Sequence, residues 1–356
     1  MPDDTAPALD ALLASAPQVA SSLSRRGFLH LAGVGLLAAT APVGKVLAAP
    51  PESWQARVAY SYGVKVRREP NLQGEELATL GHDVLVDVYE LVVSEEPAHN
   101  RVWYRVGDAE YIHSGGLQPV ATHFQMPLLS LPPTGALVDV SVPFTDMRTR
   151  PGFAASRTYR YYYSCTFWVG EIAEDEHGKL WYRIEDDRSR LSYWGLAEHF
   201  RPIPEGEMAP ISPEVDPDRK RLEVNLGRQW VVASEDDTPV FMSRGSTGLA
   251  MGNGESMTPL GRHAIFYKRP SRHMAAGDSA SDGYDLPGVP WCSYFTTTGV
   301  AFHGTYWHND FGRPRSHGCV NLPTEAARWI HRWAMPVVPP GEHIVQGVSG
   351  TRVVVS

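Results

Sequence analysis

The sequence predicts a mainly β protein, with two small β modules ahead of a larger β domain that carries one short helix. Glycine (32 residues) and proline (29) are plentiful, and tryptophan (10) and tyrosine (15) are frequent. This composition is typical of many short strands joined by tight turns, with aromatic side chains filling small cores. The chain has 356 residues, which is enough for two or three compact domains.

Charge and hydropathy exclude one class of partner. Apolar residues make up 43% of the chain and charged residues 20%, and the formal net charge is −8. These fractions are ordinary for a soluble globular protein. A nucleic-acid-binding protein needs a basic face that displaces counterions from phosphates, so we expect no nucleic-acid partner.

Paired arginines near the N-terminus indicate export. Arg25 and Arg26 precede an apolar stretch at residues 31–43, and small residues follow up to Ala48. The arrangement resembles a twin-arginine signal peptide, so we expect cleavage after Ala48 and removal of residues 1–48. The apolar stretch is shorter than the roughly 20 residues of a membrane span, so no stable span is expected after cleavage. An uncleaved signal acting as a membrane anchor and a buried N-terminal helix are the alternatives.

Two stretches of the chain resemble each other. Each holds an arginine-proline turn, a pair of alternating middle strands and a Trp-Tyr-Arg strand, at nearly constant spacing, which indicates duplication. The matching elements are 66–70 and 147–151, then 102–106 and 180–184, then 116–120 and 200–203. The pattern resembles bacterial SH3 domains, which are small barrels that bind peptidoglycan or act as spacers in many wall enzymes. Both roles remain open for the two modules, at 58–120 and 137–203.

A connector and a third domain follow. Residues 204–218 are rich in proline and acidic side chains, which predicts an extended linker. Beyond it, strands are expected at 222–225, 229–233, 263–267 and 300–304, with turns at 226–228 and 258–261. Ala326, Ala327, Ile330 and Trp333 have helical spacing. We therefore expect a β domain over 219–348 with a helix near its end.

The cysteine count points to a free thiol. Cys165, Cys292 and Cys319 are the three cysteines, so at least one thiol is unpaired in an exported protein. A disulfide between Cys165 and Cys292 would leave Cys319 alone. The alternative is that both are buried free thiols, because cysteine packs well as a small apolar residue.

Histidines near Cys319 favour nucleophilic chemistry. A thiol with an ordinary pKa near 8.5 is mostly protonated at neutral pH, and an adjacent imidazole that accepts its proton makes it competent as a thiolate–imidazolium pair. His303, at the end of an expected strand, and His317 are the candidate bases. Gly318 lets the backbone approach a substrate closely, so nearby amides can hold an oxyanion.

The full set of residues resembles one enzyme family. The string 316–321, Ser-His-Gly-Cys-Val-Asn, with His303-Gly304 upstream and the turn 258–261, is similar to the YkuD-type L,D-transpeptidases over roughly residues 219–347. The resemblance implies a β-sandwich catalytic domain with a short helix after the nucleophile. It also implies that the partner is a peptidoglycan stem peptide, with no cofactor and no metal.

The resemblance also implies a role for each residue. Cys319 attacks the carbonyl of the diamino acid at position three of a stem tetrapeptide, D-alanine leaves, and an amine of a second stem resolves the thioester. His303 matches the general base, oriented by the Gly304 carbonyl. The flanking residues are Ser316 and His317, Gly318 contributes to the oxyanion hole together with the Cys319 amide, and Asn321 is expected in the substrate-binding region, where it fixes the loop.

Two segments depart from the family pattern. The loop between His303 and Ser316 is near the short end of the expected length. A long stretch from Arg269 to Pro290 separates two strands and is interpreted as a lid. Tyr306, Trp307 and His308 are expected to line the substrate pocket.

Three rival functions stay open. A zinc site could use His303, His308, His317 and Cys319, although structural zinc sites favour tightly paired spacings. An L,D-carboxypeptidase would use water instead of an amine. A wall-binding protein with an inert cysteine domain is the third.

Overall fold

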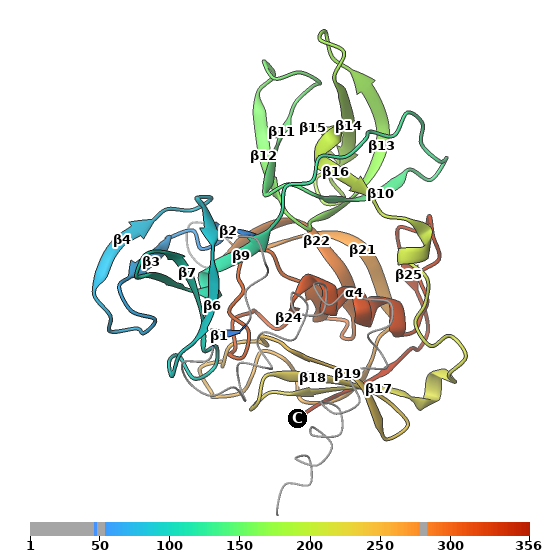
Figure 1. Cartoon of the computed structure of the whole chain (residues 1–356). Helices are drawn as coiled ribbons and strands as arrows, with labels where there is room; N and C mark the ends of the chain where they lie inside the picture. Colours follow the sequence, from blue (N-terminus) through green and yellow to red (C-terminus); the bar gives the residue numbers. More distant parts are fainter. Residues whose placement is uncertain (1–45, 48–53, 278–282) are drawn as a thin grey trace, which may run out of the picture.

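The computed structural model describes residues 46–47, 54–277 and 283–356. The expected mainly β architecture is confirmed, with five sheets and one α-helix in the described residues. Figure 1 shows the first module in blue to teal, the second in green, and the C-terminal domain in yellow to red against both of them. The twin-arginine segment lies outside the described residues. In the part of the chain that the structure describes, no helix has the length and apolar character needed to cross a membrane.

The first module is built from eight strands and one 3-10 turn. They are β2 (Trp54–Val58), β3 (Val64–Arg67), β4 (Glu76–Leu80), β5 (Leu85–Val88), β6 (Glu90–Val93), β7 (Val102–Gly107), β8 (Glu110–His113), η3 (Ser114–Gly116) and β9 (Leu117–Val120). A two-residue strand, β1 (Val46–Leu47), pairs with β6. Alternating positions such as Val64 and Val66 are buried and form the core with Tyr104, Ile112 and Leu117.

The second module repeats this plan. Its elements are β10 (Ala136–Val140), β11 (Phe144–Arg148), β12 (Arg157–Tyr162), β13 (Thr166–Glu174), β14 (Leu180–Glu185), β15 (Ser192–Leu196), η4 (Ala197–His199) and β16 (Phe200–Pro202). β10 pairs with β13 and β16 as β2 pairs with β5 and β9. β11 pairs with β12 and β15 as β3 pairs with β4 and β8. The strand pairing therefore recurs in both modules, as the sequence repeat predicts.

The predicted linker is not a free extended spacer. It contains η5 (Glu205–Glu207) and η6 (Pro217–Arg219). Met208 joins the hydrophobic core of the C-terminal domain, and Glu207 makes an ion pair with Arg328. These contacts override the extended tendency of the composition, so the segment packs along the C-terminal helix.

The C-terminal domain has two five-stranded sheets. One has the order β19 (Thr238–Arg244), β18 (Trp230–Glu235), β17 (Lys220–Asn225), β26 (Arg352–Val355) and β20 (Gly261–Ala264). The other has the order β24 (Val320–Leu322), β23 (Ala301–Gly304), β22 (Tyr284–Tyr294), β21 (Tyr267–Ala276) and β25 (Val345–Gln346). The expected end at residue 348 is too early, because β26 pairs with β17 and β20 inside the first sheet.

The helix α4 (Thr324–Trp333) packs against residues from both sheets. Ala326, Ala327, Ile330 and Trp333 are buried, as their spacing predicts, in one core with Val224 of β17 and other residues of both sheets. Its last carbonyls accept hydrogen bonds from buried lysines. Lys268 Nζ donates to the Ala334 carbonyl at 2.7 Å, and Lys220 Nζ donates to the Trp333 carbonyl at 3.1 Å. The last carbonyls of a helix have no partner within the helix, so these hydrogen bonds stabilise the element that follows the candidate nucleophile.

Candidate active site

Parallel strands bring the candidate nucleophile and the candidate base close together in the fold. β23 and β24 pair in parallel, with His303 opposite Asn321. Cys319 directly precedes β24 and is two positions before Asn321, so this pairing brings it beside β23, the strand that carries His303. Both residues line one cleft.

The tautomer of His303 leaves one ring nitrogen to act as a base. The ring is 2% exposed, and its Nδ1 lies 3.0 Å from the Gly304 carbonyl oxygen. A carbonyl only accepts hydrogen bonds, so Nδ1 carries the proton and Nε2 of the neutral ring is an acceptor. Burial lowers the pKa of His303 to about 4, although the Gly304 bond acts against the shift. The Gly304 carbonyl is therefore the hydrogen-bond partner of His303 Nδ1.

The resting thiol is neutral as well. Desolvation raises the pKa of Cys319 to about 11, and a backbone hydrogen bond with Ala301 partly opposes this. With the pKa of His303 near 4 and that of Cys319 near 11, the neutral pair is the stable one between these values. Both shifts oppose a thiolate–imidazolium pair, so we expect the proton transfer to accompany substrate attack.

Ser316 and Gly318 shape the turn that presents the thiol. Ser316 Oγ donates to the Cys319 carbonyl and accepts from the Gly318 N–H at 3.1 Å. Gly318 has a φ of +133°, and an added Cβ would lie 3.1 Å from the Met257 carbonyl oxygen, so a side chain here is strained and crowded. The Gly318 N–H is already bonded in this state, and an oxyanion there would have to share it with Ser316.

Thr258 supports the turn that precedes Cys319. The sequence placed Thr258 in the 258–261 turn but did not predict this contact. Its side chain is fully buried. Its hydroxyl donates to the Gly318 carbonyl at 2.7 Å and accepts from the Gly248 N–H at 2.7 Å. Thr258 thereby holds the nucleophile turn from behind.

The sequence predicted that His308 lines the substrate pocket, but this residue is not part of the cleft lining. It is 2% exposed, its Nδ1 accepts from the Asp310 N–H at 3.1 Å, and its Nε2 lies 3.0 Å from the Asn321 side-chain amide. Burial, followed by the charge of Arg315, lowers the pKa of His308 to about 3, so the ring is neutral. Asn321 also exchanges two backbone hydrogen bonds with Ser246. His308 and Asn321 thus fix the loop, and an aromatic run alone could not distinguish this from pocket lining.

The other predicted residues lie at the cleft. Its lining includes His303, Tyr306, Trp307, Ser316, His317, Cys319 and Asn321. His317 is exposed, and its ring lies 5.5 Å from that of Tyr284. The segment interpreted as a lid is the β21–β22 hairpin, and Tyr284 belongs to its second strand.

The other two cysteines are buried free thiols. Cys165 of the second module and Cys292 of β22 belong to one hydrophobic cluster. Burial raises the pKa of Cys165 to about 12, so its thiol is inert. Of the two predicted alternatives, a disulfide or two buried free thiols, the structure shows the free thiols.

Zinc ligation is not supported by the arrangement of side chains. Within residues 54–277 and 283–356, no group of three or more His, Cys, Asp or Glu side chains is placed to hold a metal ion. His308 is turned away toward Asn321.

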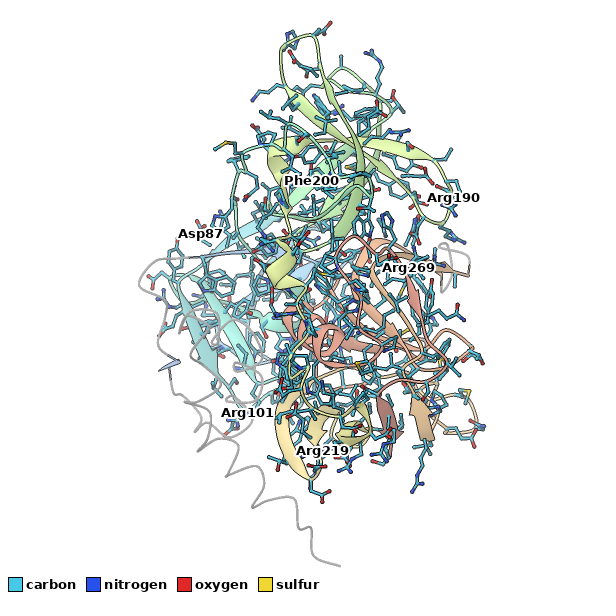
Figure 2. All side chains as sticks on the ribbon, turned by 90° about the vertical axis from the view of Figure 1, so that its right-hand side faces the viewer. Asp87, Arg101, Arg190, Phe200, Arg219 and Arg269 are labelled. Atoms are coloured by element: carbon cyan, nitrogen blue, oxygen red, sulfur yellow. The ribbon has the colours of Figure 1, made fainter. Side chains whose placement is uncertain are left out.

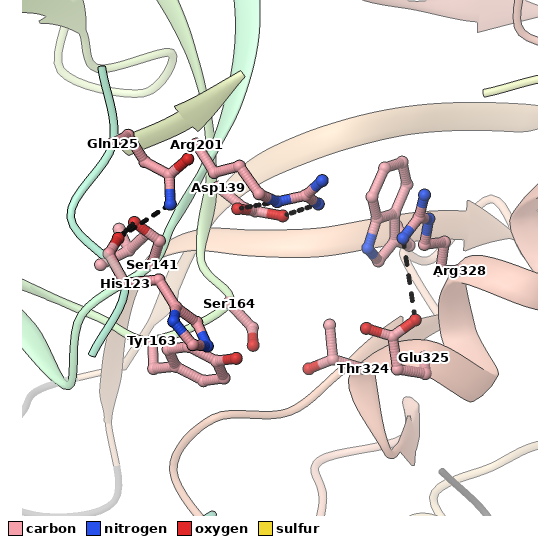
Figure 3. Close-up of a pocket in the computed structure, with 12 residues that line it drawn as sticks. His123, Gln125, Asp139, Ser141, Tyr163, Ser164, Arg201, Thr324, Glu325 and Arg328 are labelled. Carbon is pink, nitrogen blue, oxygen red and sulfur yellow. Dashed lines mark hydrogen bonds and ion pairs between the residues drawn. The ribbon is translucent and has the colours of Figure 1, made fainter. Parts of the chain in front are cut away.

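A second cavity, of about 280 Å³, lies between the second module and α4. Its charged side chains pair with each other: Arg201 donates to Asp139 at 2.6 Å, and Arg328 lies 3.8 Å from Glu325 (Figure 3). Cys319 and His303 are absent from its lining. The cavity belongs to the junction that fastens the second module to the helix.

The C-terminal domain is similar to a known catalytic domain. Residues 219–355 match the family model of YkuD, the L,D-transpeptidase catalytic domain. No curated protein sequence matches the chain.

Several solved structures are similar to part of the chain. A mutant of the Enterococcus faecium L,D-transpeptidase is 21% identical, with a TM-score of 0.30, over 39% of this chain and 50% of that chain. An L,D-transpeptidase from Xylanimonas cellulosilytica is 24% identical, with a TM-score of 0.27, over 40% and 62%. One from Mycobacterium smegmatis is 18% identical, with a TM-score of 0.32, over 52% and 98%. The chain thus spans about half the length of the Enterococcus faecium protein.

Proposed function

We propose that the chain, whose residues 219–355 match the YkuD L,D-transpeptidase catalytic domain, is an exported peptidoglycan L,D-transpeptidase with Cys319 as its nucleophile. The observation that carries the proposal is that Cys319, two positions before the Asn321 that pairs with His303, lines the same cleft as His303, whose Nε2 can accept a proton. Under this proposal the two N-terminal modules are SH3-like and the protein acts in the cell wall.

The first half of the reaction transfers an acyl group to sulfur. His303 Nε2 takes the thiol proton as Cys319 Sγ attacks the carbonyl carbon of the diamino acid at position three. The tetrahedral oxyanion is held by the Cys319 N–H and shared with the Gly318 N–H. The bond to D-alanine breaks, its amine takes the proton from His303, and a thioester remains.

The second half returns the enzyme to its starting state. A side-chain amine of another stem peptide, or of a protein, attacks the thioester carbonyl and gives its proton to His303. The carbon–sulfur bond breaks, and the sulfur recovers the proton. Because both groups are neutral at rest, no ion pair has to be neutralised when substrate displaces water from the cleft.

Product analysis tests the proposal. Purified disaccharide-tetrapeptide is incubated with the protein, and the products are separated and identified by mass spectrometry. A dimer cross-linked through the third residues of two stems is the expected product. A shortened tripeptide alone would instead establish an L,D-carboxypeptidase, and unchanged substrate would favour the wall-binding protein with an inert domain. Carbapenem labelling of Cys319 is a further expectation from the family resemblance.

A further inference from the structure

The cleft above Cys319 has walls from three parts of the chain. Its volume is about 620 Å³. The C-terminal domain supplies the nucleophile turn and the strand β22. The first module supplies residues 59–62 together with Arg57 and His82, and the second module supplies residues 158–160 and Tyr162 of β12. A simple spacer would not be expected to form part of the cavity that holds the nucleophile.

Buried polar contacts fix the first module in place. Arg57 is 1% exposed, and it donates to the Tyr306 carbonyl and to Asp83, both at 2.9 Å. Asp310 of the C-terminal domain is 1% exposed and lies 2.8 Å from His99 Nε2 of the first module. Of these contacts, Arg57 with the Tyr306 carbonyl and His99 with Asp310 cross to the C-terminal domain. A buried charge is costly unless it is paired, so the buried Asp310 favours the docked module.

The second module is fastened to the hairpin that forms another wall. Its Asp187 makes ion pairs with Arg269 at 2.8 Å and Arg272 at 2.7 Å, and Asp186 makes an ion pair with His273. Figure 2 shows Arg269 at the junction between this module and the C-terminal domain. The cleft is therefore preformed by docked modules and does not depend on a flexible tether.

One aromatic side chain projects from the first module at the cleft. Tyr62 is 74% exposed, although it lines the cleft. Its neighbour Tyr60 is anchored, because its hydroxyl contacts Asp310 at 3.2 Å and the Arg315 guanidinium lies 4.9 Å from its ring centre. The ring of Tyr62 lies 5.0 Å from that of Tyr60.

The turn that carries Tyr62 is rigid. The Gly63 N–H donates to the Tyr60 carbonyl at 3.0 Å. Gly63 has a φ of +82°, and an added Cβ would lie 2.4 Å from the Leu80 carbonyl oxygen. The aromatic ring is thus held out into solvent by a defined backbone, which limits the entropy lost when a ligand packs on it.

We propose that the first module is part of the substrate site and that Tyr62 is a specificity-determining residue for the acyl donor. Its ring packs on peptide planes and methylene groups of the stem peptide while Cys319 attacks the scissile carbonyl. This inference rests on the proposed function. It assigns the module a role in selecting the stem peptide, in place of a spacer role or a separate wall-binding role.

The test compares two exposed tyrosines of the same module. Tyr62→Ala removes the ring from the cleft, Tyr62→Phe keeps the ring, and Tyr89→Ala removes a ring that is 45% exposed and outside the cleft lining. Disaccharide-tetrapeptide turnover gives kcat/KM, and alkylation of Cys319 by iodoacetamide reports the thiol without the stem peptide.

We expect Tyr62→Ala to lower kcat/KM for the stem peptide about five- to tenfold, chiefly through KM, a size typical of one aromatic contact. Tyr62→Phe and Tyr89→Ala should stay within about twofold of the wild type, and all variants should alkylate at the wild-type rate. Equal kcat/KM values for Tyr62→Ala and Tyr89→Ala, with an active wild type, would overturn this inference alone. A wild type without turnover would overturn the proposed function, and this inference with it.

Discussion

Asp310 is a buried carboxylate whose removal should lower the stability of the protein strongly. Its carboxylate accepts hydrogen bonds from Arg313 and Arg315 at 2.7 Å each and lies 2.8 Å from His99 Nε2. Burial alone would raise its pKa, but His99 and then Arg313 outweigh this and hold the pKa of Asp310 well below its usual range. The contribution of the carboxylate is therefore fully present above its unfolded pKa near 4 and is lost at lower pH.

The expected magnitude follows from what Asp310→Asn leaves behind. Breaking a buried ion pair by removing one partner costs about 3–5 kcal/mol. The Arg313 and Arg315 side chains are 48% and 21% exposed, so water compensates part of their charge. We therefore expect a loss near the lower limit, about 3 kcal/mol.

Urea unfolding at pH 7 measures this loss. The control is Asp236→Asn, which removes an ion pair with Arg219 in which both side chains are more than half exposed. Such surface pairs contribute about 0–1 kcal/mol. Midpoints should therefore fall clearly for Asp310→Asn and barely for Asp236→Asn. If the two variants lost equal free energy of unfolding, the buried ion pairs of Asp310 would contribute no more stability than a surface ion pair.

Three further predictions concern ionisation at the site. His303→Ala should slow acylation by a stem peptide by about 10²–10⁴ through loss of the base, and a larger loss in His317→Ala would move the base role to His317. Alkylation of Cys319 should rise about tenfold per pH unit from pH 7 and level off only near its pKa of about 11, whereas a plateau reached below pH 7 would mean a preformed ion pair. The pKa of His308 lies at about 3 in the folded state, below its unfolded value near 6.5, so its stability contribution is present above pH 6.5 and lost as the pH falls. Between pH 8 and pH 5 this histidine should account for about 2 kcal/mol of lost stability. Urea unfolding of His308→Asn at the two pH values should therefore show a smaller loss of stability than the wild type. An unchanged pH dependence of stability in this variant would contradict the prediction.

Local patterns predicted the elements that carry the chemistry. The spacing of Ala326, Ile330 and Trp333 predicted α4, and residues 222–225 and 300–304 fall on β17 and β23. The string around Cys319 predicted the nucleophile turn because its residues act on one another over two or three positions, as Ser316 does on Gly318.

The sequence did not predict the β21–β22 hairpin. Pro287 and Pro290 argue against a central strand, yet both lie in β22. β23 pairs with β22 only at Ser293 and Tyr294, so the prolines occupy the part of β22 that β23 does not pair with. The interpretation as a lid followed from the length of the stretch between two strands, and the pairing of β22 with β21 leaves no signal in that length.

The walls of the cleft could not be predicted from the sequence. Arg57 contacts the Tyr306 carbonyl across 249 positions, and Tyr60 contacts Asp310 across 250. Neither contact leaves a periodic signal in the chain, and both follow from how the modules dock. For the same reason, the sequence could not show that His308 is buried away from the cleft while its neighbour Trp307 lines it.

The acyl-enzyme itself provides the most direct test of the central claim. Intact-protein mass spectrometry shortly after mixing with disaccharide-tetrapeptide should show the mass of the substrate minus D-alanine on the wild type, located at Cys319 by peptide mapping. The Cys319→Ala variant, with an unchanged circular dichroism spectrum, should carry no adduct and release no D-alanine. D-alanine release by Cys319→Ala at the wild-type rate would contradict the assignment of the nucleophile.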